Sequence, residues 1–417
     1  MLIFVLFGIE ILLLLITYFT MKRDIFRPSV LMFSVFVIST FIAVLNVYNW
    51  KINYLPKTIL VMTLGFLCAA AADYIGYFLF KNRHSTAQEL KVLRVKNWKI
   101  ILIVIFEIIS LILYFKEIKR LAILDGYVPG ANLLWHYRNI TSLQAKASVN
   151  GFVSLLIKTI DAFCYVFTFA FIQNLLSKKV KLKEYILFIV PIILFAVKVL
   201  MGSNRLELLK WTAFAIVVSY ILVQYKNGWS KSISIKYIKS ALIIVPVAFV
   251  LFYLATNVIG RKTTRTFFQY ISTYAGGSIQ HFNQYITNPS LDETHFGAET
   301  FPGIYSFLHR IGLVDYTRSV HLEMRRLGIT QGNLYTFFRR PYHDFGLFGM
   351  CLMTFLVFLV FSWMYSSFKV RRLHSRTNYL IICYCYLFHW VVLSSIENYS
   401  IGIVSLGTII TLILMKC

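Results

Sequence analysis

Long apolar stretches recur along the whole chain, and they constrain its fold more than any other feature. A helix of about 20 apolar residues crosses the roughly 30 Å hydrocarbon core of a bilayer. Eleven stretches meet this criterion, at residues 1–20, 29–48, 58–80, 100–117, 152–175, 185–201, 207–225, 240–258, 343–366, 378–394 and 399–415. Because backbone polar groups find no water in lipid, these stretches are expected to be helical. The sequence therefore predicts an all-α polytopic membrane protein with about eleven transmembrane helices.

The composition excludes the soluble classes of protein. Of the 417 residues, 58% are hydrophobic and only 14% are charged, whereas a soluble protein carries about a quarter charged residues. The six cysteines show no C-x-x-C spacing, so neither a disulfide framework nor a cysteine metal site is predicted.

Lysine-rich loops alternate along the chain with loops of different composition, and this alternation predicts the topology. Five loops hold 3, 6, 4, 4 and 4 cations, and all five lie on one side if every span crosses once. They are residues 22–27, 81–99, 178–183, 226–239 and 369–376. The positive-inside rule places them in the cytoplasm, with the N-terminus outside and the C-terminus inside. The net charge of +25 is thus interpreted as a topology signal, and no nucleic acid is expected as a partner.

The predicted organisation has three parts. Residues 1–258 hold the first eight spans, residues 259–342 form a large external loop, and residues 343–417 hold the last three spans. The external loop contains eight arginines and one lysine. Arginine presents a planar fork of donors that binds phosphate or carboxylate through two hydrogen bonds. The loop therefore predicts an anionic ligand on the outer face, with a solvated basic surface as the alternative.

Two basic motifs lie at predicted outer span ends. Gly202-Ser-Asn-Arg205 is a tight turn that places Arg205 at a helix N-terminus, where backbone N–H groups also attract anions. Gly260-Arg-Lys-Thr-Thr-Arg265 follows the eighth span and puts Arg261 and Arg265 at the same height. Arg205, Arg261 and Arg265 are candidate diphosphate ligands. The alternative is that these cations anchor the chain to lipid headgroups.

Two further segments carry candidate catalytic and sugar-binding residues. Tyr274 and His281 lie in a stretch of aromatic, glycine and amide residues, a composition that suits a sugar. Residues 333–346 contain Asn333, Tyr335, the paired cations Arg339 and Arg340, His343 and Asp344. His281 and Asp344 are the candidate proton acceptors, with His281 placed first. The alternative for Asp344 is that it caps the ninth span.

No metal or cofactor is predicted. The histidines and carboxylates show no H-E-x-x-H spacing and no D-x-D pair at an external span end.

Four motifs together resemble the bacterial oligosaccharide repeat-unit polymerases, the Wzy-type O-antigen and capsule polymerases. They are Arg27-Pro-Ser29, the turn at 202–209, residues 274–282 with Phe296-Gly-Ala-Glu299-Thr-Phe301, and residues 333–346. With the topology they cover essentially the whole chain. Two positions depart from the family pattern: Asn204 is inserted into a turn that often reads Gly-Ser-Arg, and His343 stands where the family is variable.

The resemblance implies a GT-C-like fold and a glycosyltransferase of the bacterial inner membrane. In such a reaction the growing glycan leaves undecaprenyl diphosphate and joins the non-reducing end of an incoming lipid-linked repeat unit, without a metal. The implied partners are these two lipid-linked substrates, the bilayer, a flippase and a chain-length regulator. Arg339 and Arg340 join the diphosphate ligands, and Tyr274, Glu299, Asn333 and Tyr335 are implied glycan contacts.

Three other functions remain open at this stage. An O-antigen ligase uses the same lipid donor with a different acceptor. A lipid-linked oligosaccharide flippase transports without chemistry, but it would need no external loop of more than 80 residues. A polytopic acyltransferase is less well matched, because the spans lack a His/Asp acyl-transfer pattern.

Overall fold

The computed structural model describes residues 2–81, 86–144, 146–177, 181–229, 266–289, 296–316 and 322–416. Within these residues the chain is mostly helical, as the sequence predicts. A short β-hairpin, which was not predicted, is the exception.

Seven helices in the described residues are long and apolar enough to cross a membrane. They are α1 (Leu2–Thr20), α2 (Pro28–Leu45), α3 (Pro56–Phe78), α4 (Asn97–Leu124), α6 (Gly151–Ser177), α8 (Leu206–Lys226) and α13 (Arg339–Phe368). Each coincides with a predicted span, so these seven are confirmed as apolar helices. Pro28 and Pro56 begin α2 and α3, at the helix position where proline is best tolerated.

The other four predicted spans differ from this pattern. Residues 240–258 lie outside the described residues. The stretch at 185–201 follows the 3₁₀ turn η2 (Leu182–Glu184) and begins with a second 3₁₀ turn, η3 (Ile186–Phe188). Only 13 residues are left for α7 (Ile189–Met201). The last two stretches divide into α14 (Ser375–Leu387), α15 (His389–Val392), η4 (Tyr399–Gly402) and α16 (Leu406–Leu414). Each piece is shorter than the roughly 20 residues that a full crossing requires.

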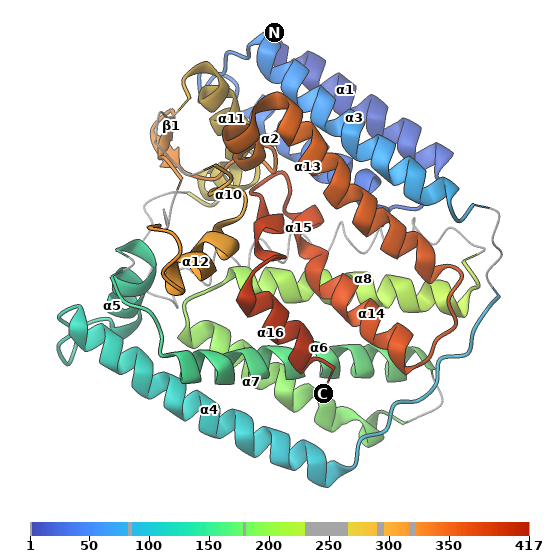
Figure 1. Ribbon diagram of the computed structural model, residues 1–417, viewed down its shortest axis with the longest axis vertical. Helices are drawn as coiled ribbons and strands as arrows, with labels where there is room; N and C mark the ends of the chain where they lie inside the picture. The colour runs from blue at the N-terminus through green and yellow to red at the C-terminus, as the bar shows by residue number, and fades with distance from the viewer. Residues whose placement is uncertain are drawn as a thin grey trace.

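The remaining elements are short. They are α5 (Leu133–Arg138), the π turn η1 (Asn139–Leu143), α10 (Phe267–Ala275), α11 (Gly277–Thr287), α12 (Pro302–Arg310), β1 (Arg325–Leu327) and β2 (Thr330–Gly332). The strands β1 and β2 pair antiparallel, with Leu327 opposite Thr330. In Figure 1 the elements α5, α10, α11, α12 and β1 gather along one side of the molecule, at one end of the long helices.

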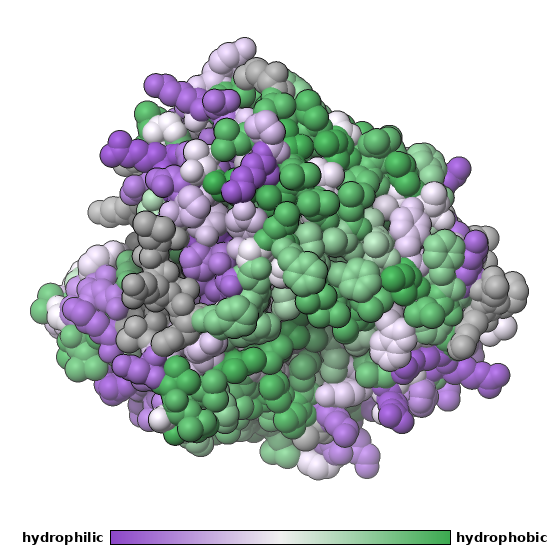
Figure 2. Space-filling view, turned by 45° about the horizontal axis from the view of Figure 1, so that its top comes forward, coloured by the Kyte–Doolittle hydropathy of each residue, from purple (hydrophilic) through white to green (hydrophobic). Residues whose placement is uncertain are grey.

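The long helices form two groups with the C-terminal helices between them. Figure 1 shows α1, α3 and α13 running together in one group, and α4, α6, α7 and α8 in the other. Figure 2 shows hydrophobic side chains in a broad band across one face, with hydrophilic side chains gathered on both sides of that band. This distribution is what a membrane-embedded protein presents to lipid and to water.

Lysine-rich loops that are far apart in the sequence meet at one end of the bundle. Lys369 Nζ lies 3.4 Å from Asp24 Oδ2. Gln88 donates to the carbonyl oxygen of Arg371 at 3.1 Å, and its own N–H donates to the carbonyl of Tyr225. We call this the lysine-rich end; it comprises residues 21–27, 86–96, 226–229 and 369–374.

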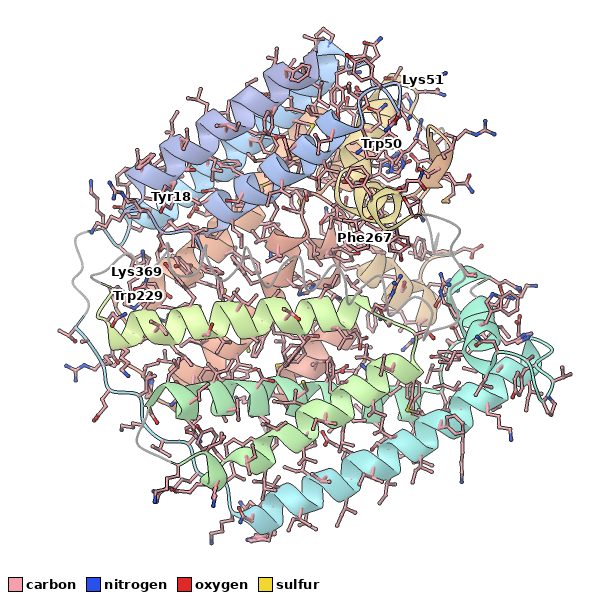
Figure 3. The ribbon with its side chains drawn as sticks, turned by 180° about the vertical axis from the view of Figure 1, so that it is seen from behind. Tyr18, Trp50, Lys51, Trp229, Phe267 and Lys369 are labelled. Carbon is pink, nitrogen blue, oxygen red and sulfur yellow. The ribbon has the colours of Figure 1, made fainter. Side chains whose placement is uncertain are left out.

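The opposite end holds the hairpin and the short helices. We call it the hairpin end; it comprises residues 46–55, 266–289, 296–316, 322–338 and 393–399. Ser278 donates to the carbonyl of Ser395, and Arg340 forms an ion pair with Glu397 there. Figure 3 shows Trp50, Lys51 and Phe267 at this end and Tyr18, Trp229 and Lys369 at the other, so the predicted alternation of loops matches the fold.

Helix α13 connects the two ends, and two glycines allow its close packing and its local shape. Against α3, a Cβ atom on Gly65 would lie 2.5 Å from the Phe338 ring, so glycine is needed for this close approach. Gly346 has φ 64° and ψ −164°, a conformation that only glycine adopts readily. It separates the short polar segment Arg339–Phe345 from the apolar remainder of α13.

We expect cysteines placed at the two ends to react from opposite sides of the membrane. Ile329 is 92% exposed in the hairpin, and Lys91 is exposed at the lysine-rich end. In right-side-out vesicles an impermeant maleimide should label Ile329→Cys, and it should label Lys91→Cys only after the membrane is opened. The protein without these substitutions is the control for labelling of its native cysteines. Labelling of both variants from the same side would contradict the arrangement.

Candidate functional site

A buried arginine lies at the centre of the hairpin end. Arg339 is the first residue of α13 and is fully buried. Its guanidinium forms ion pairs with Glu299 and with Glu323, the second at 2.8 Å, and lies 4.1 Å from the ring centre of Tyr285. The two carboxylates come from separate segments of the chain, residues 296–316 and 322–338. Because an unpaired buried charge is strongly destabilising, this pairing holds those segments against the end of α13.

The two adjacent arginines are both paired with carboxylates. Arg340 Nε donates to Glu397 Oε1 at 3.2 Å, which ties α13 to the connection between α15 and η4. In this structure the charges of Arg339 and Arg340 are therefore balanced within the protein. Their predicted binding of diphosphate stays a prediction, and it would require a phosphate to displace a carboxylate.

His343 continues the network around Glu299. Burial raises the pKa of Tyr285 to about 12, so its hydroxyl keeps its proton and can donate to His343 Nδ1 at 2.8 Å. The other ring nitrogen, Nε2, lies 3.7 Å from Glu299 Oε1. Burial also raises the pKa of Glu299, against the opposing effect of Arg339. A chain of polar contacts thus runs from Tyr285 through His343 to Glu299 and Arg339.

Asp344 has one occupied and one unoccupied carboxylate oxygen. Oδ2 accepts a hydrogen bond from the backbone N–H of Thr300 at 2.6 Å. Oδ1 is buried and has no hydrogen-bond partner among the described residues. Neither oxygen accepts a hydrogen bond from a backbone N–H of α13 among the described residues, so the structure does not show Asp344 as a cap of the apolar part of that helix. An acceptor oxygen without a partner is instead available to a ligand or a water molecule.

His281 is enclosed by its surroundings. The imidazole is fully buried, and Nδ1 lies 2.8 Å from the carbonyl oxygen of Leu334, which can only accept. Burial lowers the pKa of His281 to about 4, so the neutral ring carries its lone pair on Nε2. Gly332 covers the ring so closely that a Cβ atom there would lie 2.8 Å from Cε1. A substrate hydroxyl could reach Nε2 only if the hairpin moved.

The predicted glycan contacts separate into two places. The Tyr335 hydroxyl is buried, donates to the carbonyl of Glu323 and accepts from Arg325, so it belongs to the Arg339 network. Asn333, which precedes Tyr335 by two residues in the sequence, is half-buried. Tyr274 instead packs on Tyr270, with 4.9 Å between ring centres.

Arg205 forms a second basic group. It immediately precedes α8, as predicted, and donates to the hydroxyl of Tyr270 at 2.7 Å. Seven residues before it, near the end of α7, buried Lys198 forms ion pairs with Asp161, at 2.7 Å, and with Glu207. The other predicted diphosphate ligands, Arg261 and Arg265, lie outside the described residues.

Sequence reasoning missed Glu323. It is one of only five carboxylates among nine cations in residues 259–342. The scarcity of carboxylates among so many cations favours their pairing with buried cations. The sequence does not indicate which cation each carboxylate contacts. As for metals, no group of three or more His, Cys, Asp or Glu side chains in the described residues could hold an ion.

Comparison of the chain with protein-family models, curated proteins and solved structures found no match.

We expect Arg339→Gln to destabilise the protein. The substitution leaves Glu299 and Glu323 without their common partner, and loss of one partner of a buried ion pair costs about 3 kcal/mol. The thermal unfolding midpoint in detergent should fall accordingly. Arg326→Gln removes the same charge from an exposed position of the β1–β2 hairpin, and the unfolding midpoint should change little. Equal midpoints for the two variants would show that the network does not support the fold.

The buried His281 should make stability depend on pH. The unfolded chain binds a proton at this residue near pH 6.5, whereas the folded protein resists protonation until about pH 4. Stability from this site is therefore present above about pH 6.5 and is lost as the pH falls toward 4, by up to roughly 3 kcal/mol.

His281→Asn provides the matched comparison. An asparagine can keep the donor to Leu334 while removing the titrating ring. Between pH 7 and 4.5, the unfolding midpoint of the original protein should fall more than that of the variant. Parallel pH profiles would mean that His281 is accessible to protons in the folded state.

Proposed function

We propose that this protein is a membrane glycosyltransferase that polymerises oligosaccharide repeat units carried on undecaprenyl diphosphate. The observation that supports it best is the convergence of Glu299, Tyr335, Arg339 and Asp344 at one end of an apolar helix bundle. These residues come from two of the four motifs that resemble the repeat-unit polymerases, Glu299 from residues 296–301 and the other three from residues 333–346. A polar network at the end of membrane-spanning helices suits a substrate whose sugar is in water and whose carrier is in lipid.

The proposal includes the finer topology. Eleven spans in a GT-C-like arrangement would put the hairpin end on the outer face of the bacterial inner membrane, with the N-terminus outside and the C-terminus in the cytoplasm. Residues 259–342 would then form the external domain between the eighth and ninth spans.

In the proposed reaction, an acceptor hydroxyl attacks the anomeric carbon of the growing glycan. The bond from that carbon to the diphosphate oxygen breaks, and the diphosphate leaves with its electron pair. Arg205 is the diphosphate contact that we favour, because it lies at the N-terminus of α8, where backbone N–H groups also attract anions. Charge stabilisation of this kind is a large part of most enzymatic rate enhancement.

Asp344 is the proton acceptor that we favour. Its Oδ1 is without a hydrogen-bond partner among the described residues, while Oδ2 is held in place by Thr300. His281, which sequence reasoning placed first, also has a buried atom without a hydrogen-bond partner among the described residues, Nε2, but Gly332 of the hairpin packs directly on its ring. A general base must come within about 3 Å of the hydroxyl it deprotonates, directly or through one water.

A bacterial strain that lacks this protein tests the proposal. We expect its surface glycan to be limited to a single repeat unit, and long chains to return with the original gene. Asp344→Asn should keep the contact to Thr300 but fail to restore long chains, at normal protein abundance. Asp315→Asn removes an exposed carboxylate from the same loop and should restore them. Loss of all attached glycan would instead indicate a ligase or a flippase, and unchanged glycan would refute a role in this pathway.

A further inference from the structure

An open pocket at the hairpin end lies beside the Arg339 network and shares Arg325 with it. Its volume is about 480 Å³, within the range of small-molecule sites, which is about 300–1,000 Å³. Ten residues line it: Lys51, Asn53, Leu55, Gln280, Asn283, Gln284, Thr287, Asn288, Arg325 and Arg326. Five of these side chains are amides, three are cations, and none is acidic.

Hydrogen bonds between distant segments build the pocket walls. Asn283 on α11 accepts from the hydroxyl of Thr58 at 2.7 Å and donates to the carbonyl of Asn53 at 2.9 Å, which holds the loop at 46–55. Gly328, at φ 58° in the hairpin turn, approaches the carbonyl of Asn49 so closely that a Cβ atom there would collide with it. The loop, α11 and the hairpin are thus held as one frame.

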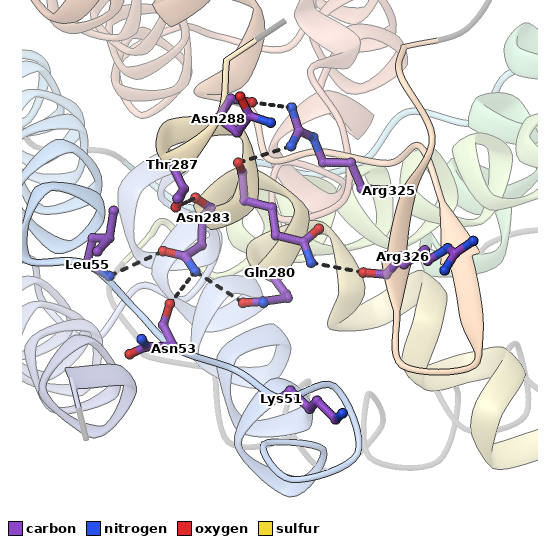
Figure 4. A pocket seen from close by; sticks show the side chains of 10 residues that line it. Lys51, Asn53, Leu55, Gln280, Asn283, Thr287, Asn288, Arg325 and Arg326 are labelled. Atoms are coloured by element: carbon purple, nitrogen blue, oxygen red, sulfur yellow. Dashed lines mark hydrogen bonds between the residues drawn. The ribbon is translucent and has the colours of Figure 1, made fainter.

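One of the three cations supports the pocket wall, and the other two lie at its rim. Arg325 points inward and donates to the carbonyls of Gln284, at 3.1 Å, and Asn288, at 2.6 Å, so it supports the wall. Lys51 and Arg326 are exposed at the rim. Figure 4 shows the amides of Gln280 and Asn283 between the loop that carries Lys51 and the strand that carries Arg326.

This lining matches a ligand with both hydroxyl groups and a negative charge. Amide side chains donate and accept, as sugar hydroxyls require, whereas lysine and arginine only donate. A pocket with cations and no carboxylate favours an oxyanion over a neutral group. Arg325 also connects the pocket to the Arg339 network, since it lies 3.5 Å from Glu323.

We propose that this pocket binds a carboxylate-bearing sugar of the glycan, through Lys51 and Arg326 at its rim and the exposed amides of Asn53 and Asn288. The choice of a saccharide over another hydroxylated anion rests on the proposed function. The inference adds a substrate class to it: repeat units that contain an acidic sugar.

Calorimetric titration of the full-length protein in detergent tests the proposal. The probes are a disaccharide that contains a uronic acid, its neutral counterpart, and inorganic phosphate. We expect the acidic disaccharide to bind, with an affinity that falls as salt increases. Lys51→Gln and Arg326→Gln should each weaken it by about fivefold. Lys57→Gln, an exposed cation that does not line the pocket, should leave it unchanged.

Any one of four results would overturn the proposal. Equal affinity for the neutral disaccharide would remove the role of the charge. Binding of phosphate as strong as that of the acidic sugar would indicate a site for phosphate or lipid headgroups. Absence of binding, or original affinity in both rim variants, would reject the pocket. These outcomes are independent of the glycan pattern of the deletion strain, so failure of the pocket and failure of the proposed function are distinguishable.

Discussion

Two buried guanidinium groups determine where α13 lies, and the rest of the structure depends on them. At the lysine-rich end, fully buried Arg27 pairs with Asp73 of α3 at 2.5 Å and donates to Ser362 and Ser366 of α13. At the hairpin end, Arg339 of α13 pairs with Glu299 and Glu323. Loss of one partner from a buried ion pair is far more costly than the pair itself is stabilising. Both ends of the helix are therefore held in one register relative to their partners.

The geometry of the hairpin end depends on this position of α13. Close packing of α3 against Phe338, allowed by Gly65, places Arg339 where the external segments can reach it. The break at Gly346 then turns His343 and Asp344 toward Glu299 and Thr300. Catalytic groups held by a rigid element are positioned more precisely than groups on free loops, which reduces the reorganisation needed during a reaction.

The sequence predicted the features that depend on local patterns. Apolar length alone located α1 and α13, and loop charge alone separated the lysine-rich end from the hairpin end. It did not predict where a stretch such as 378–394 would break, at Phe388, because tertiary contacts decide that. Nor did it predict the partners of Arg339, since Glu299 and Glu323 lie 40 and 16 residues away in a loop without periodicity. Long-range ion pairs have no signature in a single sequence.

Arginine content in an external loop is thus an ambiguous signal for ligand binding. Arg339 and Arg340 are paired with carboxylates, and Arg325 donates to backbone carbonyls, so all three build the fold. The planar fork of donors that suits phosphate suits these internal acceptors equally well. Burial with a partner is what separates the two uses. Among the cations of the hairpin end, exposed Lys51 and Arg326 are therefore better placed for an anion than the paired arginines, which hold the surrounding segments in place.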